Sequence, residues 1–269
     1  MYKIIMYYLS ALLMTLVTTI TFASTALPEM SFVSIPAGSY TMGTTDLLEA
    51  QFEIPPSNTL TINDEQPAHI VQLDAFEIGK YEVTQAQWLA IMGTRPGPDE
   101  YWRHPQWQRL PVVSVSWDDT QLFIERLNER DQHYLYRLPT EAEWEYVSRS
   151  GSSSLRPFEV ENLGEHAWTL ANSGDMPHPV GQLKANAVGV HDIFGNAWEW
   201  VNDWYQPDAY QQHASKNPVG PARGKLKTRR GGSYHCASHL VRAAYRAADV
   251  PSQRYSVLGF RLQRTLRNK

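Results

Sequence analysis

Residues 189–200 read GVHDIFGNAWEW and combine two carboxylates, a tight Gly-Asn turn and closely spaced tryptophans. Asp192 and Glu199 supply carboxylate oxygens, and the turn would expose the backbone carbonyls of Gly195 and Ala197 between them. Oxygen ligands of this kind suit a hard cation. The segment therefore predicts a calcium site built from these four residues.

The same segment has a second, purely structural interpretation. Trp198 and Trp200 would then be core aromatics, the Gly-Asn pair only a turn, and the two carboxylates helix caps or ion-pair partners. On spacing alone this interpretation is favoured over the calcium site.

Downstream, residues 230–236 read RGGSYHC and are followed by His239. The two glycines allow another backbone to approach closely, as a peptide-binding groove requires. His235, Cys236 and His239 also offer an imidazole and thiolate set for a soft metal such as Cu(I). If residues 232–236 form a strand, however, His235 and Cys236 point to opposite faces and cannot share one ion.

Three helices are predicted upstream of these motifs. Thr84 with Gln87 forms a capping box for a helix that Gly93 ends. A second helix is expected over residues 116–130, with acidic residues in its first turn. Thr140 and Glu143 form a further capping box, and Gly151 is placed to stop that third helix.

Strand patterns are short and lie between long loops. Residues 31–43 alternate apolar and small side chains and predict a strand and a turn, and residues 69–78 predict a second strand. Residues 44–63 contain two prolines and no clear period, which indicates a surface loop. Helical signals fade beyond residue 151. The pattern as a whole predicts one irregular α+β domain over residues 27–269.

Composition excludes several classes of protein. The chain has 269 residues and a formal net charge of −4 without a block of like charges, so nucleic acid is not an expected partner. Residues 1–26 have the layout of a signal peptide, with a short charged start, an apolar stretch and small residues. We therefore expect a periplasmic or secreted protein without a further membrane segment. Cys236, the single cysteine, has no intrachain disulfide partner.

Taken together, the motifs resemble the formylglycine-generating enzyme (sulfatase-modifying factor) family. The resemblance covers residues 31–264 and rests on motifs that occur in the family's order: Ser31–Gly43, Tyr81-Glu82-Val83-Thr84 with Trp88, Pro111-Val112-Val113 with Val115-Ser116-Trp117, Arg137–Glu145, Asn186 with Gly189, Gly195–Trp200, Arg230-Gly231-Gly232-Ser233 and Gly259-Phe260-Arg261. It implies a single α+β domain related to the C-type lectin fold, with little regular secondary structure.

The resemblance assigns roles to several of these positions. Cys236, Ser233 and Trp198 match residues of the family's catalytic site, and Asp192, Gly195, Ala197 and Glu199 match a family calcium site. After the resemblance, the calcium interpretation becomes the favoured one. The family's copper oxidases hold Cu(I) with two cysteines five residues apart, but here Val241 stands at the second position. Three further site positions also differ, namely Ala237, Leu240 and Val257.

Two classes of function remain open from the sequence. One is a metal- and oxygen-dependent oxidoreductase that acts on a protein cysteine or a small periplasmic metabolite, with Cys236 and His239 as ligands of copper or iron. The other is a non-catalytic binding or scaffold module that recognises a peptide or an envelope partner. In the second case Arg223, Arg229, Arg230, Arg242 and Arg246 would lie near the groove and could engage a carboxylate. The sequence leans towards an enzyme, because its one cysteine is kept at the reactive position.

Overall fold

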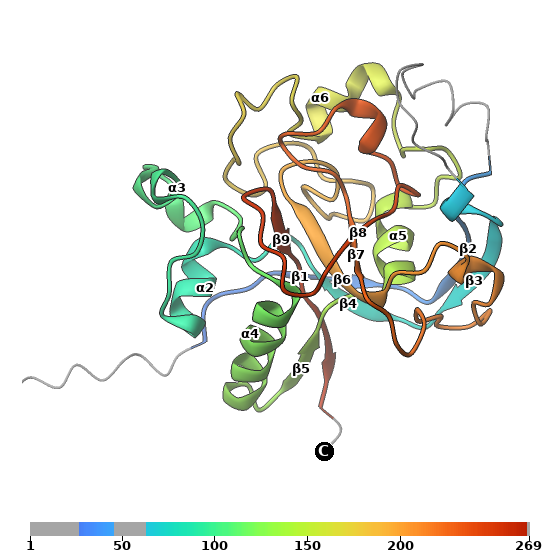
Figure 1. The fold of residues 1–269 in the computed structure, drawn as a ribbon, viewed down its shortest axis with the longest axis horizontal. Coiled ribbons are helices and arrows are strands. Elements are labelled where there is room, and N and C mark those ends of the chain that lie inside the picture. Colours follow the sequence, from blue (N-terminus) through green and yellow to red (C-terminus); the bar gives the residue numbers. More distant parts are fainter. Residues whose placement is uncertain (1–26, 46–62, 268–269) are drawn as a thin grey trace, which may run out of the picture.

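Three small sheets organise residues 27–45 and 63–267, the part of the chain that the computed structural model describes (Figure 1). The first has the order β1-β4-β10-β5 and the second pairs β2 with β3. The third has the order β8-β7-β6-β9, in which β6 and β9 run parallel. The strands are β1 (Phe32–Ile35), β2 (Gly38–Met42), β3 (His69–Leu73), β4 (Phe76–Gly79), β5 (Tyr134–Arg137), β6 (Trp198–Trp204), β7 (Lys227–Arg230), β8 (Ala247–Asp249), β9 (Leu258–Phe260) and β10 (Gln263–Leu266).

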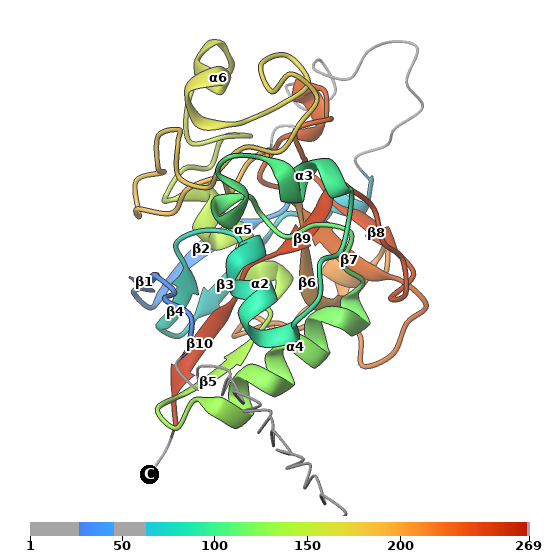
Figure 2. The same cartoon turned by 90° about the vertical axis from the view of Figure 1, so that its left-hand side faces the viewer.

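Helices flank these sheets. Figure 2 shows α2 beside α4, and α5 packs against strands of two sheets, β2 on one side and β6 and β7 on the other. The helices are α2 (Gln85–Met92), α3 (Asp99–Arg103), α4 (Trp117–Arg130), α5 (Glu141–Arg149) and α6 (Leu163–His166). Short 3-10 turns lie at Asn63–Glu65, Trp107–Arg109, Val160–Asn162, Ala209–Gln211 and Ser238–Leu240. Among the described helices, none is both long enough and apolar enough to cross a bilayer.

The predicted helix starts are confirmed. The side chains of Thr84, Ser116 and Thr140 each accept a hydrogen bond from the backbone N–H three residues later, and each third residue returns a bond to the cap. Gly93 ends α2 in the left-handed conformation with φ 71°. The prediction for Gly151 was wrong by one position, because Ser150 takes the left-handed cap of α5 with φ 49°.

The predicted strands are present but divided. Residues 31–43 contain both β1 and β2, which belong to different sheets. Residues 69–78, predicted as one strand, contain β3 and β4, and these also pair in different sheets. The break falls at residues 74–75, where Asp74 turns its backbone N–H to the side chain of Asn217. The predicted signal peptide and most of the predicted 44–63 loop lie outside the described residues.

Large aromatic side chains fill the core. Trp88 stacks on Phe123 with ring centroids 5.5 Å apart, and Phe260 meets both rings edge-on. Trp144 and Trp200 are fully buried, and the indole of Trp200 donates a hydrogen bond to the carbonyl of Val115. These contacts join α2, α4 and β9 to β6, and so fix the strand from which the candidate site is built.

Candidate functional site

The Cys236 loop begins where β7 ends. Gly231 and Gly232 take left-handed conformations with φ 101° and 77°, and the backbone N–H of Cys236 then bonds back to the carbonyl of Ser233 at 3.0 Å. This turn places the Ser233 hydroxyl 3.3 Å from the Cys236 sulfur, and both side chains are buried. Residues 232–236 are therefore a turn and not a strand, and the turn brings together two of the three predicted catalytic residues.

The histidines next to Cys236 have other surroundings. The His235 side chain is 61% exposed and pairs with Asp175, so it points away from the buried thiol. His239 lies in the Ser238–Leu240 turn, where its carbonyl accepts a hydrogen bond from Arg242. Across residues 27–45 and 63–267, no three histidine, cysteine, aspartate or glutamate side chains converge as a metal-ligand group.

Trp198, the third predicted catalytic residue, lies in β6 and is 4% exposed. Its ring centroid is 5.9 Å from that of Tyr245, and the guanidinium carbon of Arg229 lies 4.4 Å from the Trp198 ring. Burial raises the pKa of Tyr245, and the nearby Arg229 guanidinium opposes that rise. Tyr245 therefore packs against Trp198 and lies close to Arg229.

Val241 occupies the place of the second copper-binding cysteine and is fully buried. Its Cγ2 atom packs so tightly on Gly232 that a Cβ there would lie only 2.8 Å away. The soft donors of this loop therefore reduce to one sulfur, Cys236, whose neighbour within hydrogen-bond distance is a hydroxyl. Cu(I) favours paired soft ligands, so the residues present do not fit the family's copper site.

The predicted calcium residues lie in a buried acidic cluster. Both oxygens of Glu199 accept hydrogen bonds from Arg261 at 2.7 Å, and the Trp144 indole donates to one of them. Asp192 accepts a bond from the backbone N–H of Gly181 through Oδ2, while its Oδ1 is buried without a hydrogen-bond partner.

A third carboxylate, Glu82, belongs to the same cluster. Its oxygens accept bonds from the backbone N–H of Ala197 and the side chain of Asn196. Burial raises its pKa well above the usual value, and the charges of Asp192 and Glu199 raise it further. The sequence analysis had used Glu82 only as part of a motif. Its position beside apolar core residues could have indicated a buried carboxylate.

Of the predicted calcium residues, Asp192 keeps one buried carboxylate oxygen without a hydrogen-bond partner among the described residues. Burial raises the pKa of both Asp192 and Glu82. Glu199 is already neutralised by a bidentate pair. A cation here would depend on Asp192 together with the backbone oxygens of Gly195 and Ala197.

The arginines that were expected near a groove are mostly structural. Arg230 and Arg246 are buried and converge on Glu141, with Arg230 also 2.5 Å from Glu145. Burial by itself raises the pKa of Glu141, but the two guanidinium groups outweigh it and hold this pKa below the usual value. These side chains form a closed ionic core, which the sequence analysis had misread as a binding surface.

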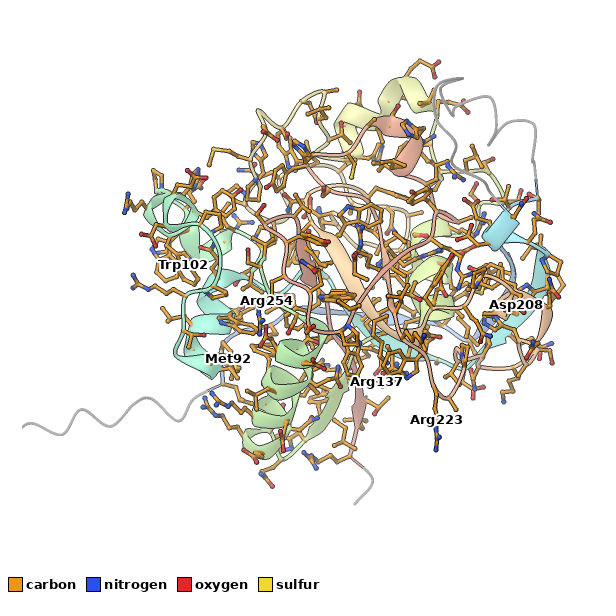
Figure 3. The ribbon with its side chains drawn as sticks, in the orientation of Figure 1. Met92, Trp102, Arg137, Asp208, Arg223 and Arg254 are labelled. Carbon is orange, nitrogen blue, oxygen red and sulfur yellow. The ribbon has the colours of Figure 1, made fainter. Side chains whose placement is uncertain are left out.

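The other three arginines are also placed differently from the prediction. Arg242 forms a buried bidentate pair with Glu65. Arg223 projects from the lower edge of the molecule, whereas the Ser238–Leu240 turn lies at its upper edge (Figures 1 and 3). Arg229, which pairs with Asp249, borders the Cys236 site through its contact with Trp198. Arg242 also reaches the site, because it donates to the His239 carbonyl and lies over the Tyr245 ring.

The model of a protein family, the sulfatase-modifying factor enzyme 1-like domain, matches residues 19–266. The chain belongs to this family. Bovine formylglycine-generating enzyme is 29% identical to it, over 87% of this chain and 74% of the enzyme. Hercynine oxygenase of Mycolicibacterium smegmatis is 26% identical, over 86% of this chain and 60% of the oxygenase. Some relatives in the sulfatase-modifying factor family are therefore oxidative enzymes.

The fold agrees with a solved member of the same structural group. PvdO from Pseudomonas aeruginosa superposes with a TM-score of 0.73 at 30% sequence identity, over 87% of this chain and 94% of PvdO. The single α+β domain expected from the sequence is thus confirmed. What distinguishes this member of the sulfatase-modifying factor family is the local chemistry around Cys236.

Proposed function

We propose that this chain is an exported recognition protein, which binds a peptide or small molecule at the Cys236 site without copper-dependent oxidation. The observation that supports this most strongly is the packing of Val241 on Gly232. A hydrocarbon side chain fills the position where a copper oxidase of the family needs a second thiolate. The export follows from the signal-peptide layout of residues 1–26.

The surroundings of Cys236 suit recognition. Trp198 and Arg229 stack beside the thiol loop. Within the loop, the phenol of Tyr234 shares a 2.8 Å hydrogen bond with that of Tyr101. Aromatic and arginine side chains dominate the energetics of many binding interfaces. Trp198, Tyr101 and Tyr234 are buried like Cys236, so a peptide laid along the loop would first meet Arg229, which is partly exposed.

An oxidoreductase is the second candidate. It is favoured by the Ser233–Cys236 contact, which keeps the family's serine and first cysteine together, and by the similarity to an oxygenase. Copper or iron would then be held through Cys236, with His239, three residues further along the chain, as the second ligand. The substrate would be a protein cysteine or a small periplasmic metabolite.

Metal content separates the two candidates. The protein lacking residues 1–26 is loaded with Cu(I) or Fe(II), desalted and analysed for both elements beside Cys236→Ser. We expect less than stoichiometric copper and iron in both. One equivalent of either metal that is lost in Cys236→Ser would overturn the recognition proposal and support the oxidoreductase.

A second measurement tests recognition directly. A cysteine-containing peptide is titrated while tryptophan fluorescence and dissolved oxygen are followed together. We expect saturable binding that Arg229→Ala weakens several-fold, with no oxygen consumption. Catalytic oxygen uptake that depends on Cys236 would contradict the proposal.

A further inference from the structure

A pocket of about 400 Å³ lies where five segments of the chain meet, and none of its lining residues belongs to the Cys236 site. Its walls come from the β3–β4 corner, the segment that leads from β5 into α5, the strand β6, residues 217–219 and the strand β10. Arg137 at the end of β5 is one of the lining residues and lies in the lower half of the molecule in Figure 3. The volume falls within the range of pockets that bind small molecules.

The charged groups of this pocket are neutralised within the protein. Arg137 forms two 2.7 Å bonds to Glu143, which also accepts the backbone N–H of Thr140 at the start of α5. Asp74 is paired with Lys216 and accepts a bond from the Asn217 side chain. No guanidinium or carboxylate among these groups lacks an opposite charge, so the pocket favours an uncharged ligand over an ion.

The side-chain amide of Gln263 can still donate and accept hydrogen bonds in this pocket. It lies in β10 opposite Arg137, lines the pocket, and is 1% exposed. Both its Nε2 and its Oε1 lack a hydrogen-bond partner, although a buried carboxamide normally has one. The amide lies beneath the pocket surface, and a side-chain rotation of the kind common on ligand binding would present a donor and an acceptor side by side.

Apolar groups share the pocket with these amides. Leu73 and Phe76 lie on its β3–β4 wall, and Val219 is 59% exposed at its mouth. Asn202 and Thr265 add further groups that can both donate and accept hydrogen bonds. The wall therefore combines C–H surface with neutral hydrogen-bonding side chains.

We infer that this pocket binds a neutral saccharide, whose adjacent hydroxyls satisfy the Gln263 amide. One hydroxyl donates to Oε1 and its neighbour accepts from Nε2. The C–H face of the sugar ring packs on Val219, the exposed apolar side chain of the lining. A hydroxyl both donates and accepts, so it matches the neutral side chains of this pocket, whereas an anion would find every positive charge already paired.

The test is titration of the protein with glucose, galactose, mannose and N-acetylglucosamine, followed by saturation-transfer NMR and calorimetry. We expect saturable binding of at least one of these sugars. Gln263→Leu, which keeps the side-chain size but removes both polar atoms, should weaken binding at least tenfold. Val219→Trp, at an exposed position, should also weaken it by filling the pocket mouth.

Gln132→Leu is the matched control, because Gln132 is exposed in the turn after α4 and outside the pocket. This variant should bind as the unmodified protein does. The inference is overturned if none of the four sugars binds, if either pocket variant binds like the unmodified protein, or if inorganic phosphate displaces the sugar.

Discussion

Val241 packs directly on Gly232, so that a Cβ at Gly232 would lie 2.8 Å from the Val241 Cγ2. Gly232 has φ 77°, a conformation that glycine adopts without strain. The two residues therefore pack directly against each other within the Cys236 loop region. Because Val241 stands where the family's copper oxidases have a cysteine, its replacement tests whether this position controls copper binding.

Val241→Cys should create a Cu(I) site. The new sulfur would stand beside Cys236 in a buried, soft environment, and paired thiolates select Cu(I). We expect one equivalent of copper to survive competition with a Cu(I) chelator in Val241→Cys. Val241→Ser, similar in size but without a soft donor, should bind as little copper as the unmodified protein. Equal retention by all three proteins would show that position 241 does not govern copper binding.

Calcium should stabilise the protein through Asp192. The unpartnered Oδ1 of this buried side chain is the oxygen that a cation would bind. A ligand that binds only the folded state at about 100 times its Kd adds about 3 kcal/mol to the free energy of unfolding. The Tm should therefore rise with Ca²⁺ in the unmodified protein and in Asp192→Asn, which keeps a side-chain oxygen. An equal rise in Asp192→Ala would place the ion elsewhere.

Arg230→Met should destabilise the fold strongly. Removing this guanidinium leaves Glu145 and Glu141 with less positive charge in a buried site, which typically costs about 3–5 kcal/mol. Urea unfolding followed by tryptophan fluorescence measures the loss. Arg223→Met, at an exposed position, should stay within about 0.5 kcal/mol of the unmodified protein. A loss below about 1 kcal/mol for Arg230→Met would mean that the ionic core adds little.

Stability should fall with acid through His213. Burial lowers the pKa of His213 to about 4, and both ring nitrogens are buried without a hydrogen-bond partner. The unfolded chain takes up a proton below about pH 6.5, whereas the folded chain does so only near pH 4. The folded state therefore loses stability as the pH falls through this window, by roughly 1–3 kcal/mol for a partly exposed ring. His213→Phe should flatten the decline; an unchanged urea midpoint profile would exclude His213 as its source.

The helices could be predicted from the sequence because their signals are local. In each capping pair, Thr84 with Gln87 and Thr140 with Glu143, the two residues are three positions apart. Both hydrogen bonds of each pair therefore form within one helical turn. The strand divisions could not be predicted in this way. Whether β3 pairs with β2 or with β1 depends on segments distant in sequence, and an alternating pattern is the same in both cases.

The site was only partly predictable for a related reason. Ser233 and Cys236 lie within one turn, so the sequence brings them together. The fate of Arg230 depends on Glu141 and Glu145, which lie 85 or more positions away. Arginines on both sides of a glycine-rich motif resemble a binding surface until those distant carboxylates are in place.

The buried arginine pairs also constrain the order in which the chain folds. Arg242 and Glu65 are 177 positions apart, and Arg246 and Glu141 are 105 apart. Closing such long loops costs chain entropy before any ionic contact can offset that cost. Non-local contacts of this kind therefore slow folding. A guanidinium without its partner is also expensive to take out of water. The ionic core should therefore form late in folding, after the sheets and helices have assembled. Its loss should then raise the unfolding rate more than it lowers the folding rate.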